Sequence, residues 1–255
     1  MIEIKTPAQV ARMREAGRVV ALALAAMREA AAVGVTPQDL DTVAARVLTD
    51  AGATSPFLDY HPRWAPVPFP AVLCASVNDA VVHGIPDEVP LVDGDVVSLD
   101  FGATLDGWTG DAATTFVVGD GDQGDLDLVA TTERALNAGI AQAVPGNKLG
   151  DVAHAIGAVA REAGYGLLAD HGGHGIGRTM HEPPHVPNDG RPGRGLTLRA
   201  GLVIAIEPML IAGGTDEYAT DADGWTLRTA DGTRAAHAEH TVAITEDGPQ
   251  ILTLV

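Results

Sequence analysis

The hydrophobic positions of the chain predict two helical hairpins. The first helix begins at Thr6-Pro7-Ala8-Gln9, where a capping hydroxyl, a proline at the first helical position and a Gln three residues after the cap are typical of a helix start. Its apolar face continues until Gly34, and a second helix is predicted from Thr36-Pro37 to near Gly52. The same spacing predicts helices at about 123–144 and 149–163.

Extended segments rich in β-branched residues follow each helical pair. They are predicted at 71–82, 95–105 and 108–118 in the first half, and at 201–211, 224–229 and 235–245 in the second. The segment 61–70 is predicted to be a loop, because its prolines cannot donate to a strand ladder. This order predicts an α+β fold in which helices pack on one side of a central, largely antiparallel sheet.

The repeated order of elements raises the question of an internal duplication. A shift of 112 positions places Asp39 on Asp151, and it also aligns Gly52 with Gly164. Small residues dominate these helices and align easily by chance, so the sequence leaves duplication and coincidence equally open.

Length and composition favour one compact domain, which we place at residues 1–255. Apolar residues make up 46% of the chain, enough for a sizeable core. The formal charge of −18 opposes binding to nucleic acid or to an anionic membrane. Cys74 is the only cysteine, which excludes an intrachain disulfide, and no signal peptide or membrane-spanning run is visible. We therefore expect a cytoplasmic protein.

Two acidic residues stand in the apolar strands of the first half. Asp100 follows Val96-Val97-Ser98-Leu99, where a buried strand favours another apolar residue, and Asp111 holds a similar place on the next strand. The intervening 103–107 has turn character, so a hairpin can bring the two carboxylates together. Two close carboxylates repel each other unless a cation lies between them.

The second half repeats this anomaly. Glu207 ends the run 202–206, and Glu239 precedes the apolar strand 240–244. A buried carboxylate is costly unless it is paired or bound to metal. A salt bridge to a buried Arg or Lys is the alternative for each one, but none of the 16 basic residues lies in these strand cores.

A histidine flanked by glycines completes the set. In Gly172-Gly173-His174-Gly175-Ile176-Gly177 the glycines let the backbone approach a ligand closely. A turn histidine is the commoner explanation for such a motif alone. Together with four strand carboxylates, however, His174 predicts a centre rich in oxygen ligands, suited to a pair of Mn, Fe, Co or similar divalent ions.

These residues and their surroundings resemble the bacterial type I methionine aminopeptidases, which form subfamily A of peptidase family M24. The resemblance covers nearly the whole chain. It is carried by Ile4-Lys5-Thr6-Pro7, Met13-Arg14-Glu15-Ala16-Gly17-Arg18, Ser76-Val77-Asn78, Val82-His83-Gly84-Ile85-Pro86, Gly94-Asp95-Val96, Asp100, Gly110-Asp111, Gly173-His174-Gly175-Ile176-Gly177, His181-Glu182, Ile206-Glu207-Pro208-Met209, Asp223-Gly224-Trp225-Thr226 and Glu239-His240-Thr241. It implies the pita-bread fold, with a central antiparallel sheet, two helix pairs and a pseudo-twofold repeat.

The resemblance also implies the roles of the metal ligands. Asp111 and Glu239 would bridge two divalent ions (Co, Mn, Fe, Ni or Zn), Asp100 would complete one site, and His174 with Glu207 the other. Such a pair activates water at neutral pH. The enzyme would remove the N-terminal methionine of nascent proteins and peptides, preferably before a small second residue.

Three further roles follow from the same resemblance. Glu207 would accept a proton, His181 would stabilise the oxyanion, and His83 would contact the scissile amide nitrogen. The methionine pocket would be lined by Cys74, Phe69, Trp225 and Tyr60.

Some positions depart from the family pattern. Met180 stands where many relatives carry an aromatic residue, His171 replaces a bulky residue, and the loop 59–68 is longer than usual. These departures affect the shape of the pocket, and none of them alters a metal ligand.

Two rival functions share this fold. An Xaa-Pro peptidase carries similar ligands, but usually with a large additional N-terminal domain, and non-enzymatic pita-bread proteins have lost ligands. We expect a monomer that acts on peptide or nascent-chain N-termini, near the ribosome, without direct contact to nucleic acid or membrane.

Overall fold

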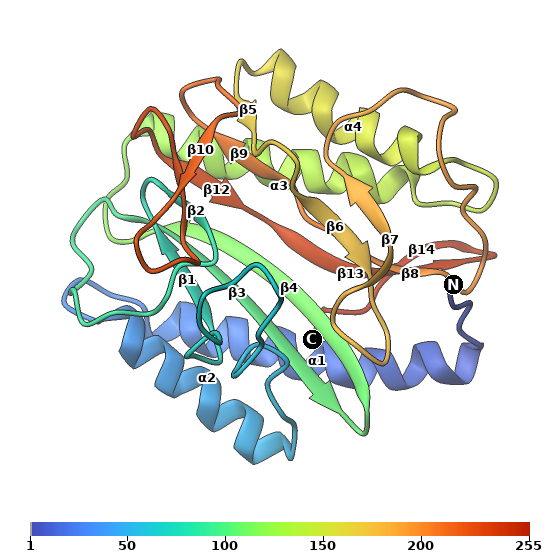
Figure 1. The fold of residues 1–255 in the computed structure, drawn as a ribbon, viewed down its shortest axis with the longest axis horizontal. Helices are drawn as coiled ribbons and strands as arrows, with labels where there is room; N and C mark the ends of the chain where they lie inside the picture. Colours follow the sequence, from blue (N-terminus) through green and yellow to red (C-terminus); the bar gives the residue numbers. More distant parts are fainter. Residues whose placement is uncertain (1) are drawn as a thin grey trace.

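A computed structural model describes residues 2–255 and has the predicted order of two helical pairs, each followed by strands (Figure 1). It also has short strands at 166–167, 172–175, 182–187, 218–220 and 248–251 that were not predicted. The helices are α1 (Pro7–Ala30), α2 (Pro37–Ala51), α3 (Gln123–Gln142) and α4 (Leu149–Glu162). The strands are β1 (Cys74–Val77), β2 (Ala80–Val82), β3 (Val96–Leu105), β4 (Trp108–Val117), β5 (Gly166–Leu167), β6 (Gly172–Gly175), β7 (Glu182–Pro187), β8 (Val203–Ile206), β9 (Met209–Ile211), β10 (Tyr218–Thr220), β11 (Leu227–Thr229), β12 (Ala235–His237), β13 (Glu239–Thr245) and β14 (Gly248–Ile251).

The main sheet joins the two halves of the chain. Its strand order is β1-β3-β4-β13-β8-β6-β7, with β14 paired to β13, and the pairings are antiparallel. Figure 1 shows β3, β4 and β13 crossing the middle of the molecule between the α1/α2 pair and the α3/α4 pair. The predicted α+β architecture is therefore confirmed.

Each helical pair packs on the strands of its own half. Leu99 and Phe101 of β3 lie in one core cluster with residues of α1 and α2. Ile206 of β8 and Val242 of β13 lie in a second cluster with residues of α3 and α4. Successive strand residues point to opposite faces of the sheet, and the helices cover one of these faces. The residues that alternate with those in the core clusters therefore lie on the other face.

Helix starts follow the sequence closely. Thr6 accepts the backbone N–H of Gln9 at 3.3 Å, and the Gln9 side chain accepts the N–H of Thr6 at 2.7 Å, which is the predicted capping box. The shift of 112 positions carries Pro37, the first residue of α2, onto Leu149, the first residue of α4. Asp39 and Asp151 then take the same capping place, which supports the pseudo-twofold repeat.

Several predicted boundaries were wrong. The first helix ends at Ala30 and not at Gly34, because Gly34 donates to the Leu91 carbonyl and Leu91 donates to Val35. The predicted strand 71–82 is two strands, since Asn78 adopts a positive φ of 60° and reverses the chain. Pro208, which has no N–H, separates β8 from β9.

No helix among residues 2–255 is long and apolar enough to cross a membrane.

Candidate metal centre

The predicted ligands come from five neighbouring strands of the main sheet. Asp100 lies on β3, Asp111 on β4, Glu239 on β13 and His174 on β6, and Glu207 follows the last residue of β8. Each strand of the run β3-β4-β13-β8-β6 thus contributes one side chain. Strand pairing thus brings together residues that lie far apart in the sequence.

Strand register places these side chains on one face. Asp100 and Glu239 both pair with Ala113 of β4, and Asp111 lies two residues before Ala113. His240 pairs with Ile206, so the same register continued by one residue sets Glu239 opposite Glu207. Since residues paired across an antiparallel sheet, and residues two apart along a strand, share a face, the carboxylates converge opposite the helices.

His174 lies in strand β6, so the alternative of a turn histidine is wrong. Gly173 permits this, because a Cβ atom there would lie 2.1 Å from the Ala205 carbonyl oxygen. The Nδ1 atom of His174 lies 2.9 Å from the Gly175 carbonyl oxygen, which can only accept a hydrogen bond. Nδ1 therefore carries the proton, and the lone pair of Nε2 points away as a possible ligand.

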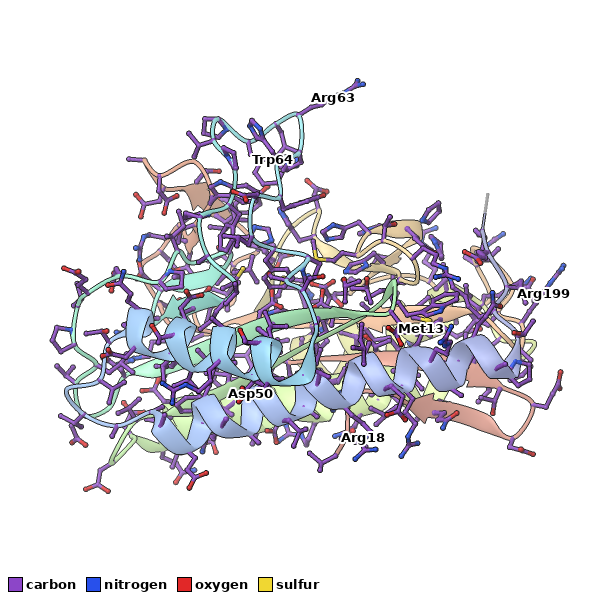
Figure 2. The ribbon with its side chains drawn as sticks, turned by 90° about the horizontal axis from the view of Figure 1, so that it is seen from below. Met13, Arg18, Asp50, Arg63, Trp64 and Arg199 are labelled. Carbon is purple, nitrogen blue, oxygen red and sulfur yellow. The ribbon has the colours of Figure 1, made fainter. Side chains whose placement is uncertain are left out.

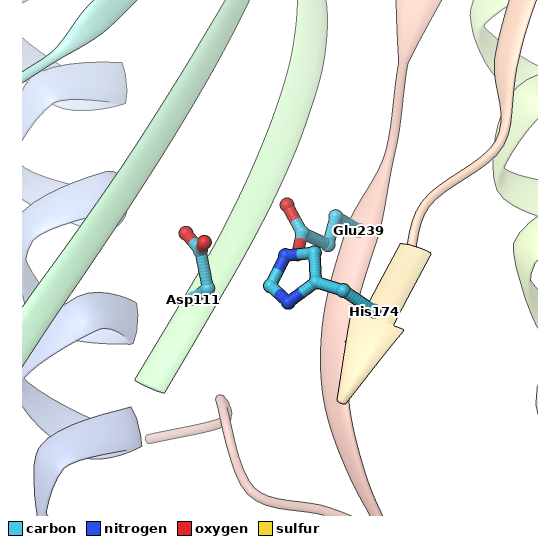
Figure 3. A group of neighbouring side chains, drawn as sticks. All are labelled: Asp111, His174 and Glu239. Atoms are coloured by element: carbon cyan, nitrogen blue, oxygen red, sulfur yellow. The ribbon is translucent and has the colours of Figure 1, made fainter. Parts of the chain in front are cut away.

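Figure 3 shows the side chains of Asp111, His174 and Glu239 turned toward one another from three strands. Each offers one ligand atom, and these atoms lie within 4.8 Å of one another. The Nε2 atom of His174 also lies 3.6 Å from Glu207 Oε1. The arrangement brings together all five residues that the sequence singled out.

The carboxylates are buried without compensating cations from the protein. The atoms Asp100 Oδ1, Asp111 Oδ1 and Glu239 Oε1 are buried and have no hydrogen-bond partner within residues 2–255. In this described part of the chain their charged neighbours are histidines, and no Lys or Arg pairs with them. The alternative of a buried salt bridge to Arg or Lys is therefore wrong.

The electrostatics of the cluster favour a bound cation. Burial, followed by the charges of Asp111 and Glu207, raises the pKa of Asp100 well above its usual range. Burial and Glu207 raise the pKa of Asp111 to about 8, and burial with Asp111 raises that of Glu239 strongly. Burial also opposes ionisation of Glu207, but the imidazoles of His237 and His174 outweigh it and lower its pKa to about 2.

Orphaned carboxylate oxygens together with an imidazole form a donor set that suits Mn, Fe, Co, Ni or Zn. A divalent cation would remove the repulsion between the carboxylates and satisfy the oxygens that have no partner. The residues present therefore fit a metal centre.

Two predicted histidines stand beside this cluster. Burial, followed by the neighbouring His171, lowers the pKa of His83 to about 4. His181 lies at the mouth of the cavity, where its ring packs on His174 with centroids 4.4 Å apart. Desolvation by this packing and the His174 imidazole lower the pKa of His181 to about 4. Both rings are therefore neutral at physiological pH.

The predicted pocket residues line one cavity with the metal cluster. The cavity has a volume of about 430 Å³, and Cys74, Phe69, Trp225 and Tyr60 form part of its wall. Phe69 and Trp225 meet edge to face with centroids 5.1 Å apart. Cys74 pairs with Asp100 across β1 and β3, so it lies beside the carboxylates, and burial raises the pKa of its thiol strongly.

The positions that depart from the family pattern also reach the cavity. Met180 packs in the same apolar cluster as Phe69 and Trp225, and His171 lines the wall next to His83. The long loop carries Trp64, whose ring lies 4.9 Å from that of Trp225.

His237 and Trp64 are among the cavity residues that were not predicted. His237 is buried, and its Nε2 atom lies 3.6 Å from Glu207 Oε2. It ends β12, two residues before Glu239 begins β13, and this spacing in extended chain puts both side chains toward the same side, which was a signal in the sequence. Trp64 lies in a segment predicted only as a loop, so no periodic pattern pointed to it.

Comparison with known proteins identifies relatives over the whole chain. Residues 11–246 match the profile of metallopeptidase family M24. Methionine aminopeptidase 1 of Mycobacterium tuberculosis is 54% identical over 249 residues, which cover 95% of this chain and 91% of that protein. The crystal structure of methionine aminopeptidase from Thermotoga maritima superposes with a TM-score of 0.95 at 41% identity and covers 100% of both chains.

The Xaa-Pro rival is more distant. The structure of Xaa-Pro dipeptidase from Bacillus anthracis superposes with a TM-score of 0.78 but is 22% identical, covering 98% of this chain and 61% of that one. This likeness establishes a shared fold alone. The chain therefore belongs to the M24 metallopeptidases and, among them, to the type I methionine aminopeptidases, which makes it a metal-dependent hydrolase of N-terminal peptide bonds.

Proposed function

We propose that this protein removes the N-terminal methionine from peptides and nascent proteins with a pair of divalent cations, preferring a small second residue. The observation that carries the proposal is the convergence of orphaned carboxylates and His174 at one end of a cavity whose wall is apolar. The charged end of the cavity suits the amino terminus of a substrate, and the apolar wall suits the side chain of its methionine.

Two cations fit the grouping of the side chains. Asp111 and Glu239 lie within reach of both positions, and Glu239 belongs to both groups of neighbouring ligand atoms. His174 and Glu207, whose Nε2 and Oε1 atoms lie 3.6 Å apart, would complete one position, and Asp100, whose Oδ1 has no partner within residues 2–255, would complete the other. When bound, such a pair supplies an activated water and polarises the carbonyl of the first peptide bond.

The neighbouring side chains would serve the same reaction. His181, neutral and close to His174, can donate an N–H to the oxygen on which negative charge develops. His83, also neutral, can hydrogen-bond the scissile amide nitrogen. Glu207 is the proton acceptor, since its lowered pKa keeps it ionised at neutral pH.

The cavity supports selectivity for methionine and for a small second residue. Its wall joins Phe69, Trp225 and the neutral thiol of Cys74, which are surfaces suited to a flexible thioether chain. At the mouth, His83 lies between Trp64, at 6.5 Å, and His171, at 6.4 Å between ring centroids. These rings leave little room for a bulky second side chain.

We further propose one catalytic domain over residues 1–255, acting as a cytoplasmic monomer on nascent chains near the ribosome. The family match over residues 11–246 supports the single domain. Cys74 is buried and is the only cysteine of the sequence, so it cannot form an intrachain disulfide, which fits a reducing compartment. The charge of −18 argues against direct binding to RNA or anionic lipid.

Peptide hydrolysis with a metal count tests the proposal. Protein reconstituted with Mn²⁺ or Co²⁺ should bind two ions per chain and release methionine from Met-Ala-Ser and Met-Gly-Met-Met. It should spare the N-acetylated forms, because an acetyl group removes the free amine. Failure on these peptides with cleavage of Xaa-Pro peptides would refute the methionine aminopeptidase activity.

A further inference from the structure

His237 is a buried histidine whose ring faces the carboxylates without a hydrogen bond. Its side chain is about 2% exposed, and its Nε2 atom lies 3.6 Å from Glu207 Oε2 and 3.9 Å from Glu239 Oε2. Across residues 2–255 this nitrogen has no hydrogen-bond partner. A buried polar atom left in this way costs free energy, so an unpaired Nε2 needs an explanation.

The backbone of His237 is held firmly in place. The Thr115 hydroxyl donates to the His237 carbonyl at 2.7 Å and accepts the His237 N–H at 2.9 Å. Because the only hydroxyl proton of Thr115 is used for that carbonyl, Ser98 Oγ, 2.7 Å away, donates to Thr115. The ring is thus aimed at Glu207 and Glu239 by hydrogen bonds that span three strands.

A purely structural role explains these contacts less well. Both carboxylate oxygens lie beyond the usual length of a hydrogen bond from Nε2. A distance somewhat above 3 Å between donor atoms is, by contrast, normal for two ligands that share one cation. Glu207, His237 and Glu239 each offer such an atom, all within 4.8 Å of one another.

We propose that His237 is a sixth protein ligand, and that its Nε2 binds the cation held by Glu207 and Glu239. This proposal rests on the dinuclear centre described above. That cation would then have two imidazoles, because the Nε2 atoms of His174 and His237 each lie 3.6 Å from one oxygen of Glu207. An added imidazole should make the position held by Glu207 favour Co, Ni, Fe or Zn over Mn.

X-ray absorption of the Co²⁺-loaded wild-type protein tests the proposal without any substitution. Imidazole rings give a characteristic outer-shell scattering, and we expect two rings for two cobalt ions. A single ring for two bound ions would overturn the role of His237 while leaving the proposed function intact. Wild-type protein that binds no second cation would overturn both proposals.

Titration of His237→Gln with Co²⁺, followed by calorimetry and by visible absorption, gives a second readout. One of the two affinities should fall by at least about tenfold, in the range usual for a lost ligand contact, and the cobalt spectrum should change. The selectivity of that site for Co²⁺ over Mn²⁺ should also fall. Unchanged affinities and an unchanged spectrum would contradict a ligand role.

His240→Gln is the matched control. His240 lies on the same strand as Glu239 but pairs with Ile206, on the face toward the helices, and its Nδ1 is 2.8 Å from Thr253 Oγ1. This substitution should leave both cobalt affinities at their wild-type values. An equal loss in both variants would mean that a general disturbance of the strand, and not a lost ligand, lowers the affinity.

Discussion

The floor of the cavity comes from the middle of a sheet, whereas much of its wall comes from loops. Asp100, Asp111 and Glu239 lie on paired strands, and their common face follows from strand alternation. Tyr60 and Trp64 lie on the long loop, and that loop is held by contacts with distant parts of the chain. The floor provides the charged groups for catalysis, and the wall determines which substrates bind.

This contrast also separates rigid from adjustable parts. The backbone of a central strand cannot shift without breaking ladder hydrogen bonds on both sides, so the points from which its side chains extend are fixed. The long loop is closed by backbone hydrogen bonds between Asp59, Tyr60 and Phe69, and the indole of Trp225 donates to Val67 at 2.9 Å. Substitutions in the floor should therefore abolish the reaction, while those in the wall should change substrate binding.

Glu239→Gln is expected to have the largest effect. The substitution removes the carboxylate common to both sets of ligands, so both cations should be lost and kcat/KM should fall by at least about a thousandfold on every substrate. Steady-state kinetics and metal analysis check this. Glu246→Gln, an exposed change after the same strand, should keep activity and metal content. If the Glu239→Gln protein retained two ions, Glu239 would not be a ligand that both cations need, and the contrast between floor and wall would be wrong.

His181→Ala should be the next largest effect and separates catalysis from metal binding. Since its proposed role is to stabilise the oxyanion, kcat should fall by about a hundredfold or more while the protein still binds two ions. Rapid-quench or steady-state kinetics with parallel metal analysis measure both quantities. A matching loss of bound metal would instead mean that His181 helps to hold the cations, as the residues of the floor do. The exposed His154→Ala on α4 should change neither quantity.

The floor could be predicted from sequence because its signal is local. Asp100 and Glu207 interrupt runs of apolar residues, and the cost of burying a carboxylate makes such an interruption informative. Strand register then brings the ligands together without further information. His237 is also a polar residue among apolar ones, two residues before Glu239. A single histidine between alanines, however, is a weaker signal than a carboxylate.

The wall could not be derived in this way. Trp64 reaches Trp225 through a loop with no periodicity, and its path depends on contacts such as Asp41 accepting the N–H groups of Val72 and Leu73. Such contacts join residues far apart in the chain. The end of α1 at Ala30 was mispredicted for the same reason, because Leu91 competes for the backbone of residues 34 and 35.

Removal of metal should make stability depend on pH. In the chelated protein the pKa of Asp111 is raised to about 8, above its value of about 4 in an unfolded chain. The folded protein binds more protons between these values, so this stabilisation is complete below about pH 4 and is lost as pH rises through about 8. The lowered pKa of Glu207 acts in the opposite sense, but only below about pH 4. The lowered pKa values of His83, His181 and His240, about 4 in the folded protein, raise stability with pH, but only up to their unfolded value of about 6.5.

The melting temperature with a chelator should therefore fall by several degrees from about pH 6.5 to about pH 8. Excess Mn²⁺ or Co²⁺ should raise it and flatten this dependence, because the cations bind only the folded state. Differential scanning calorimetry at several pH values measures the effect. A melting temperature that ignores both chelator and pH would indicate that the carboxylates form a structural cluster without metal.

Trp64→Ala should have the smallest effect and sharpens the contrast most. Trp64 is 61% exposed, yet its ring packs on Trp225 and His83 at the mouth of the cavity, where a bound peptide has to leave. Loss of this aromatic contact should raise KM for Met-Gly-Met-Met by about fivefold, equivalent to roughly 1 kcal/mol, while kcat and metal content stay near wild type. Arg63→Ala, the neighbouring exposed residue in Figure 2, is the control and should leave KM unchanged. A fall in kcat with unchanged KM would instead place Trp64 with the catalytic floor, because a residue that only binds the departing chain affects the ground state and the transition state alike.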